Sequence, residues 1–337
     1  MIADRYRNDG NATLKLNPLQ LQTRQLIQEK IGSGRYQFEP VDCPICNGNN
    51  FQLLAQKDRY GLYCPNVVCR DCGLVRINPR MTDSSYAEFY DQEYRPLYTG
   101  KSANAANFFQ GQKVRGQRLY KYLLERDLLP SVDQPFVLEV GCGAGGILSH
   151  FKSRGFMVKG IDLGREYLEY GKKNHQLDLT VGTIHKLELN RTPDLIIYSH
   201  VMEHIPDPNS ELERLFEICS ESTLIYIEVP GIKNLSLGYR KDPLRYFQNA
   251  HTYSFSLTSL NNLLYKNGFY QLEGDEFVKS VFKKRLNENF EIKNDYHEVN
   301  AYLRRIEKER RYYFISRARF EIIARTAVNQ ISNTFKK

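Results

Sequence analysis

Residues 136–146 read FVLEVGCGAGG, a short apolar run followed at once by closely spaced glycines. The apolar run is typical of a buried strand, and the glycines allow a tight turn into the helix-like segment that follows. Three glycines fit the GxGxxG pattern that brings a pyrophosphate onto a helix N-terminus: Gly141, Gly143 and Gly146. Glu139 and Gly145 complete a second pattern, ExGxGxG. The stretch therefore predicts a cofactor at a strand–turn–helix junction, and the identity of that cofactor decides the chemistry.

From residue 136 onward, strand-like and helix-like pieces alternate along the chain. The strand-like pieces are FVLEV, MVKGID, DLTVG, DLIIYSH and TLIYIEVP, and segments such as REYLEYGKKN and NSELERLFEICSES separate them. Apolar runs of about five residues between helices indicate a parallel sheet covered on both faces. We therefore expect an α/β fold with a doubly wound, mostly parallel, Rossmann-like sheet.

Five of the seven cysteines lie within residues 43–72. They include two CxxC pairs, Cys43 with Cys46 and Cys69 with Cys72, separated by 22 residues. Two such turns direct four thiolates to one centre, a ligand set that suits zinc and leaves no open position for catalysis. Disulfides are the weaker alternative, because the chain shows no secretion signal. We expect a structural zinc ribbon, with Cys64 outside it as a half-buried thiol.

The sequence divides into five segments by pattern. We expect an N-terminal helical arm, a zinc ribbon, a helical lid or linker, an α/β core and a basic helical extension, at residues 1–40, 41–80, 81–132, 133–283 and 284–337. A short amphipathic helix is expected in NPLQLQTRQLIQEKI of the arm, and Thr82 or Asp83 is expected to cap the helix after the ribbon.

Positive charge is concentrated at the C-terminal end. Residues 301–337 hold ten Lys or Arg against three Glu, which is +7 of the net +8. Helical spacing places apolar residues along one side: Leu303, Ile306, Tyr313, Phe320, Ile323, Ala327 and Ile331. Such a helix either packs back on the α/β core or guides an anionic partner, such as a diphosphate-linked glycan carrier, an acidic protein or a membrane surface. Because no apolar run approaches membrane-spanning length, we expect a cytoplasmic protein, with this tail as its route to the inner face of a membrane.

Three further stretches resemble the class I S-adenosylmethionine-dependent methyltransferases. Asp162 closes the strand MVKGID about twenty residues after the glycines, where that family holds the ribose hydroxyls with an acid. SHVMEHIPDP at 199–208 is similar to its EH-[IV]-x-[DN]-P segment, and AHTYSFSLTSLNNLLYKNGF at 250–269 to its histidine, Phe-Ser and Gly-Phe pattern. A carboxylate at Glu139 would repel a pyrophosphate but can accept hydrogen bonds near a cofactor's ammonium group. The resemblance covers residues 136–275 and implies S-adenosylmethionine rather than a dinucleotide.

The same resemblance implies a set of site residues. The cofactor would be bound by Glu139, Gly141, Cys142, Gly143, Gly145, Asp162, Leu163, Ser199, His200, Tyr94 and Arg95. Tyr90, Tyr94 and Arg95 would cover it as a lid, although core packing is an equal alternative for the tyrosines. His251 is the first candidate for the base, and His200 or Glu203 is the second. Glu203 and His204 have an alternative role in shaping the turn, and the HxxxH pair formed by His200 and His204 lacks a third ligand for a metal.

The N-terminal part resembles sugar C-methyltransferases and related enzymes that act on surface glycans and secondary metabolites. The resemblance lies in a cysteine ribbon ending CGLVRINPR, followed by a tyrosine-rich helix. Those C-methyltransferases carry Tyr-x-Glu-His where this chain has Gln248-Asn249-Ala250-His251. The groups that would help to form an enolate are thus replaced, whereas a hydroxyl needs only deprotonation. The expected acceptor is a sugar-containing small molecule or lipid-linked glycan, with O-methylation favoured over C-methylation.

Two other classes of function remain as alternatives. A zinc ribbon and a basic tail also occur in RNA-modifying methyltransferases. The chain has Ser199-His200-Val201-Met202 where base-amino methyltransferases carry [NDS]PP[YF], and it lacks cysteine nucleophiles there, so nucleic acid is disfavoured as a partner. A non-catalytic scaffold is disfavoured because the glycine turn, Asp162 and His251 occur together.

Overall fold

The computed structural model describes residues 1–100, 104–236, 238–285 and 291–315. These residues form two units, and neither unit is continuous in sequence. The first unit contains Met1–Gly100, Gly231–Ser256 and the described residues from Asn294 onward; the second contains the described parts of Lys101–Pro230 and Leu257–Lys293. The segment expected as one α/β core, residues 133–283, is therefore interrupted by residues that belong to the first unit.

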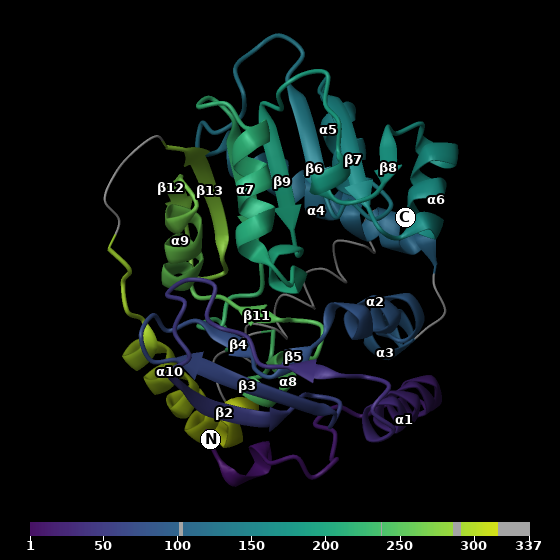
Figure 1. Cartoon of the computed structure of the whole chain (residues 1–337). Coiled ribbons are helices and arrows are strands. Elements are labelled where there is room, and N and C mark those ends of the chain that lie inside the picture. Colours follow the sequence, from purple (N-terminus) through teal and green to yellow (C-terminus); the bar gives the residue numbers. More distant parts are fainter. Residues whose placement is uncertain (101–103, 237, 286–290, 316–337) are drawn as a thin grey trace. The chain divides into compact units, whose positions relative to one another are not determined.

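A seven-stranded sheet forms the centre of the second unit, in the order β12-β13-β10-β9-β6-β7-β8 (Figure 1). Its strands are β6 (Phe136–Val140), β7 (Met157–Asp162), β8 (Leu179–Val181), β9 (Leu195–Ser199), β10 (Leu224–Glu228), β12 (Phe269–Gly274) and β13 (Lys279–Lys284). The five strands from β6 to β10 are parallel to one another, and β13 is antiparallel to both β10 and β12. The doubly wound, mostly parallel sheet is confirmed, with an antiparallel hairpin that the sequence pattern did not predict.

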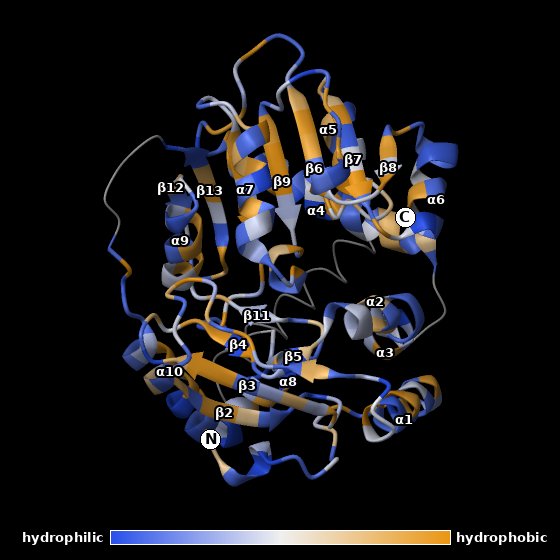
Figure 2. Cartoon of the chain, in the orientation of Figure 1, coloured by the Kyte–Doolittle hydropathy of each residue, from blue (hydrophilic) through white to orange (hydrophobic). Residues whose placement is uncertain are grey.

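Helices pack around this sheet and bury its central strands. They are α4 (Ala105–Leu124), α5 (Gly146–Lys152), α6 (Arg165–His175), α7 (Pro208–Ile218) and α9 (Leu257–Lys266), with the short helices η2 (Ile184–Lys186) and η3 (Met202–His204). Every residue of β6 and β9 is buried, as expected for a strand covered on both faces. Figure 2 shows hydrophobic residues concentrated along β6, β7 and β9.

The first unit is built on a four-stranded antiparallel sheet in the order β11-β4-β3-β2. Its strands are β2 (Phe51–Lys57), β3 (Tyr63–Cys69), β4 (Val75–Ile77) and β11 (Tyr253–Ser254), and β1 (Phe38–Glu39) pairs separately with β5 (Arg80–Met81). Its helices are η1 (Asp4–Tyr6), α1 (Pro18–Gly32), α2 (Asp83–Gln92), α3 (Tyr94–Thr99), α8 (Pro243–Tyr246), α10 (Tyr296–Glu309) and η4 (Arg310–Ile315).

Side chains cap the starts of two helices, and the cap expected at Thr82 is confirmed. Asn17 and Gln20 form a capping box at the start of α1, and Pro18 occupies its first turn. Thr82 caps α2 by accepting from the amide of Ser85 at 3.4 Å. None of the helices in the described residues combines the length and hydropathy needed to cross a bilayer.

The described part of the basic tail packs within the first unit. Leu303, Ile306 and Tyr313 are buried, while the four cations Arg304, Arg305, Lys308 and Arg311 are exposed. The predicted apolar side is thus confirmed, but it joins the core of the ribbon-containing unit rather than the α/β core. Tyr6 donates to Glu307 at 2.7 Å and so links η1 to α10. Phe320, Ile323, Ala327 and Ile331 lie outside the described residues.

Helix α4 approaches helix α5 closely because glycines face the contact. A Cβ atom on Gly116 would lie 2.9 Å from Ile147 Cα, and one on Gly146 would lie 2.3 Å from the carbonyl oxygen of Phe109. Both distances are too short for a real Cβ atom, so a side chain at either position would force the helices apart. These contacts hold α4 against the start of α5, which is the helix that follows the glycine turn.

Two alanine substitutions in α4 test this packing. Gly111 is exposed and has open space around its would-be Cβ, so Gly111→Ala should stabilise the protein by up to about 1 kcal/mol through helix propensity. Gly116→Ala should instead destabilise it by roughly 1–3 kcal/mol, because the added methyl overpacks the contact. Urea unfolding of both variants measures the difference, and equal shifts for the two would show that α4 does not pack closely on α5.

Candidate functional site

The glycine turn lies where the order of the parallel strands reverses. The chain runs from β6 outward through β7 to β8, and then crosses to β9 and β10 on the other side of β6. Ligands of open α/β sheets bind at the carboxyl edge beside such a reversal. Gly141, Gly143 and Gly145 all have positive φ, which favours glycine at each position. A Cβ atom on Gly141 would lie 2.4 Å from Val201 Cγ2, so the turn directly contacts the segment that follows β9.

Asp162, the last residue of β7, is hydrogen-bonded to the turn. Its Oδ2 accepts from the amide of Gly143 at 2.8 Å, and its Oδ1 accepts from the amide of Gly164 at 2.6 Å. Each oxygen keeps a second lone pair, so the carboxylate can still accept from two hydroxyl groups. Leu163 beside it is 71% exposed, an apolar side chain that a bound ligand can cover. The structure thus brings together three of the residues predicted to contact a cofactor.

Glu139 is buried beneath the turn. It is 1% exposed, and its Oε2 has no hydrogen-bond partner among the described residues. Burial raises the pKa of this carboxyl well above its usual range, while the charge of Arg115 acts in the opposite direction. A buried carboxyl oxygen without a partner fits an ammonium donor. Cys142 is also buried, and burial raises its thiol pKa, so it serves the turn as an inert packing residue.

Gln112 of α4 also holds the turn. Its Nε2 donates to the carbonyl of Cys142 at 2.9 Å, and its Oε1 accepts from the amides of Ala144 at 3.1 Å and Gly146 at 3.4 Å. No motif in the sequence pointed to this residue. The available signal was its position: Gln112 lies between Phe109 and Gly116 in the buried stripe of an amphipathic helix, where a polar side chain needs a partner.

The segment after β9 places a histidine and a glutamate at the same edge. His200 has a φ of 59°, and its amide donates to the carbonyl of Glu228 at 2.7 Å. Such a conformation is uncommon for a residue with a side chain and often marks a functional position. His200 Nδ1 lies 3.5 Å from Glu203 Oε1, and His204 Nε2 lies 3.8 Å from the same oxygen. The buried hydroxyl of Ser199 has no hydrogen-bond partner among the described residues.

His251, Tyr94 and Arg95 belong to the first unit. Tyr94 and Arg95 begin α3 and are half-buried, and the Tyr94 ring lies edge-on to that of Tyr90 with centroids 5.1 Å apart. The Tyr90 hydroxyl donates to the carbonyl of Ala250 at 2.9 Å. This supports the packing role that was the alternative for the tyrosines. The expected contacts of these residues with a cofactor stay predictions.

The four cysteines of the CxxC pairs converge in the first unit. Cys43 and Cys72 have sulfur atoms 3.4 Å apart, as do Cys46 and Cys69, and all four sulfurs lie within 4.8 Å of one another. Tetrahedral zinc with bonds of about 2.3 Å requires sulfurs about 3.8 Å apart, so this cluster fits a single ion.

Backbone turns set the position of the thiols. The amide of Cys43 donates to the carbonyl of Gly48 at 3.0 Å, and that of Gly73 to the carbonyl of Cys69 at 3.0 Å. Asn47 and Gly73 have positive φ, as tight turns require. Cys64 lies in β3 and outside the group, as predicted, but it is fully buried rather than half-buried because the covered sheet encloses it.

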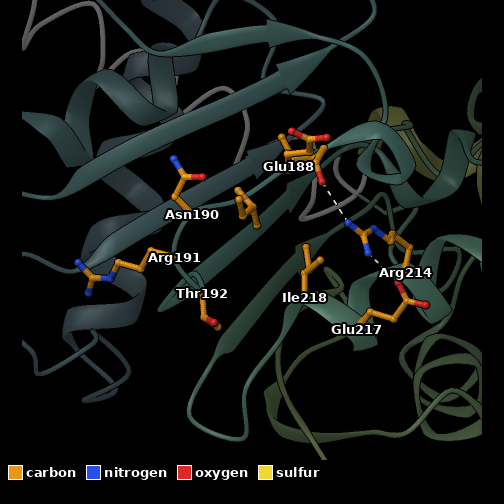
Figure 3. Close-up of a pocket in the computed structure, with 9 residues that line it drawn as sticks. Glu188, Asn190, Arg191, Thr192, Arg214, Glu217 and Ile218 are labelled. Atoms are coloured by element: carbon orange, nitrogen blue, oxygen red, sulfur yellow. Dashed lines mark hydrogen bonds and ion pairs between the residues drawn. The ribbon is translucent and has the colours of Figure 1, made fainter.

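A separate pocket of about 410 Å³ lies at the opposite edge of the second unit's sheet (Figure 3). Residues 187–192, which precede β9, line it together with Arg214, Glu217 and Ile218 of α7. Arg214 already donates to the carbonyl of Leu187 at 3.0 Å and to Glu217 at 2.7 Å. Because protein groups engage its guanidinium and the glycine turn is at the other edge, this pocket is not the predicted cofactor site.

Substitution of Gln112 tests its hold on the turn. Gln112→Ala should weaken binding of S-adenosylhomocysteine about five- to tenfold, because amides of the turn lose a fixed acceptor and the turn loses its binding conformation. Gln110→Ala on the exposed side of the same helix is the matched control and should leave the affinity unchanged. Calorimetry measures both, and an unchanged affinity in Gln112→Ala would remove Gln112 from the site.

Residues 113–273 match the family model described as a methyltransferase domain. Among curated proteins, the chain is 32% identical over 99 residues to a ubiquinone biosynthesis O-methyltransferase of Shewanella sp. (strain ANA-3), covering 27% of this chain and 41% of that protein. It is 39% identical over 90 residues to the enzyme of the same name from Haemophilus ducreyi, covering 23% and 37%. The chain thus spans less than half the length of these relatives.

Among solved structures, the chain is similar to magnesium protoporphyrin IX methyltransferase from Synechocystis PCC 6803 with bound SAH. The identity is 15% and the TM-score 0.44, over 61% of this chain and 100% of that one. A putative methyltransferase complexed with the Trm112 activator of Haloferax volcanii matches with 15% identity and a TM-score of 0.44, over 55% and 96%. The family-model match and the strand order together assign residues 113–273 as a methyltransferase domain.

Proposed function

We propose that this protein transfers a methyl group from S-adenosylmethionine to a hydroxyl oxygen, most directly one on a sugar. One observation carries the proposal. The carboxylate of Asp162 is fixed on the amide of Gly143, at the strand-order reversal and at the same sheet edge as His200 and Glu203. A cofactor-binding turn and a proton-accepting pair therefore share one edge of a methyltransferase domain.

The residues at this edge fit the polar groups of the cofactor. Asp162 has two unused lone pairs for the ribose hydroxyls, and Glu139 has a buried carboxyl oxygen for the ammonium group. Glycines in the turn allow a ligand to lie against the backbone. When bound, the cofactor supplies an already activated methyl group, so the protein needs mainly to align the acceptor and to take up one proton.

His200 is the best placed residue to accept that proton. It follows β9 directly, and the Glu203 carboxylate at 3.5 Å stabilises the imidazolium that proton transfer creates. The positive φ of His200 is held by the hydrogen bond from its amide to Glu228, which fixes the direction of the side chain. Glu203 therefore acts as the orienting carboxylate rather than as the base.

Three features support an oxygen acceptor on a sugar. The curated relatives are named O-methyltransferases, although the chain spans less than half of each. The ribbon followed by a tyrosine-rich helix resembles sugar methyltransferases, and the Tyr and Glu suited to carbon chemistry are replaced by Gln248 and Ala250. The exposed cations of α10 and η4 support an acceptor with an anionic carrier, such as a nucleotide sugar or a diphosphate-linked glycan. RNA as the acceptor is the second candidate, favoured by the same exposed cations.

Methyl transfer itself is the test of this function. Incubation with labelled S-adenosylmethionine and separate panels of nucleotide sugars, lipid-linked glycans and RNA should label a glycan oxygen. His200→Gln should lower kcat by about 10²- to 10⁴-fold, because the proton acceptor is lost. His297→Gln, at an exposed position of α10, is the matched control and should be fully active. Full activity in His200→Gln would exclude His200 as the base, and labelling of RNA alone would favour the second candidate.

We also propose that the four clustered cysteines bind a structural zinc ion. Four thiolates complete its coordination, so the metal would hold the loop before β2 to the β3–β4 turn and take no part in methyl transfer.

Elemental analysis of protein purified without chelators should find one zinc per chain. Cys69→Ala should lose the metal and destabilise the first unit, because the remaining thiols cannot close the coordination shell. Cys64→Ala is the matched control and should keep the metal, because Cys64 lies outside the cluster. Metal-free protein, or metal loss in Cys64→Ala, would contradict the assignment.

A further inference from the structure

The backbone that carries His251 is fixed within the first unit. The fully buried carboxylate of Asp58 accepts from the amides of Tyr60 at 2.8 Å, Leu62 at 3.0 Å and Asn249 at 3.3 Å. The amide of Arg59 donates to the carbonyl of Phe247 at 2.9 Å. The segment before His251 is therefore joined to the β2–β3 turn by hydrogen bonds at two positions.

Hydroxyl groups from α2 hold the same segment from another direction. The Tyr86 hydroxyl donates to the carbonyl of Asn249 at 3.2 Å, and the Tyr90 hydroxyl donates to that of Ala250 at 2.9 Å. His251 itself is 7% exposed, and its ring lies edge-on to Tyr246 at 6.4 Å between centroids. These contacts hold the imidazole in place. Its neighbours therefore decide which of its nitrogen atoms donates and which accepts a hydrogen bond.

A chain of side-chain hydrogen bonds leads from Arg59 through Gln248 to His251. Arg59 Nη2 donates to Gln248 Oε1, and Gln248 Nε2 contacts His251 Nε2. The Arg59 guanidinium lies over the rings of Tyr60 and Tyr98, at 5.0 and 5.3 Å from their centroids, which fixes its plane. All members of the chain belong to the first unit.

The direction of each bond follows from what each group can do. A guanidinium only donates, so the Gln248 atom facing Arg59 must be the amide oxygen. The amide nitrogen then faces His251, and because an amide NH₂ also only donates, His251 Nε2 must accept. A neutral imidazole that accepts at Nε2 carries its proton on Nδ1. This series of hydrogen bonds therefore fixes the tautomer of His251. Arg59 acts on His251 through Gln248, without touching the imidazole in this series.

We propose that Arg59 and Gln248 are positioning residues that hold His251 as the neutral Nδ1–H tautomer, with its Nε2 lone pair already engaged by Gln248, so that His251 does not serve as the base. The catalytic meaning rests on the proposed function, whereas the tautomer itself does not. The base of the proposed reaction is then a different residue, and His200 beside Glu203 is the candidate. This revises the sequence-based expectation that His251 is the first candidate base.

Nuclear magnetic resonance of the full chain with ¹⁵N-labelled histidine tests the tautomer directly. Two-bond correlations distinguish a protonated Nδ1 from a protonated Nε2, and the signal that disappears in His251→Gln identifies His251 among the seven histidines. Wild type at neutral pH should show the proton on Nδ1. Gln248→Glu should move it to Nε2, because a carboxylate there only accepts. Arg59→Met should give a mixture of tautomers, because the amide is then free to turn.

Gln22→Glu, at an exposed position of α1, is the matched control and should leave the His251 signals unchanged. A proton on Nε2 of His251 in the wild-type protein would overturn the proposal. This test needs no variant, so it remains valid even if a variant fails to fold. An unchanged tautomer in folded Gln248→Glu would also overturn it. The tautomer is measured without cofactor or acceptor. If His251 carries its proton on Nδ1 but the protein transfers no methyl group, the proposed function is refuted and the tautomer proposal is not.

Discussion

The hydrogen bond between the Asp162 carboxylate and the Gly143 amide is the contact on which the cofactor edge depends. It joins the turn after β6 to the last residue of β7, and it fixes an acid beside a turn that has three positive φ values. Without it the two strands would still pair, because the ladder from Phe136 to Val140 supplies their hydrogen bonds. The turn, however, would lose the group that sets its orientation. Gln112 binds other atoms of the same turn, so the turn is held by both a carboxylate and a side-chain amide.

The parts of this arrangement that the sequence predicted are those with local signals. Each central strand is an apolar run, the glycine spacing follows from the turn, and the cysteine pairs are repeated at short range. The hairpin of β12 and β13 was not predicted, because β12 is mostly half-exposed and β13 has lysines at both ends, so neither has an apolar run of about five residues. The cap of α2 at Thr82 was recognisable for the same local reason.

Long-range contacts account for what the sequence did not predict. Residues 231–256 lie in sequence between two segments of the second unit, but they pack in the first unit, which contains the ribbon. The sequence pattern does not reveal this packing. The hydrogen bonds of Gln112 to the turn and the full burial of Cys64 depend on residues that are distant in sequence, so neither was predicted. His251 was identified as a site residue from its motif. Its hydrogen-bonding direction is set by Arg59, nearly two hundred positions away in the chain, and no motif contains both residues.

Hydrogen–deuterium exchange with and without S-adenosylhomocysteine tests the central claim most directly, because it reports where the ligand binds. Slower exchange is predicted in three segments of the second unit, at residues 139–146, 162–164 and 199–204, since their amides surround the proposed site. The pocket segment at 187–192 should exchange at an unchanged rate. No change in any segment, or protection restricted to the pocket segment, would contradict the assignment of the glycine turn as the cofactor site.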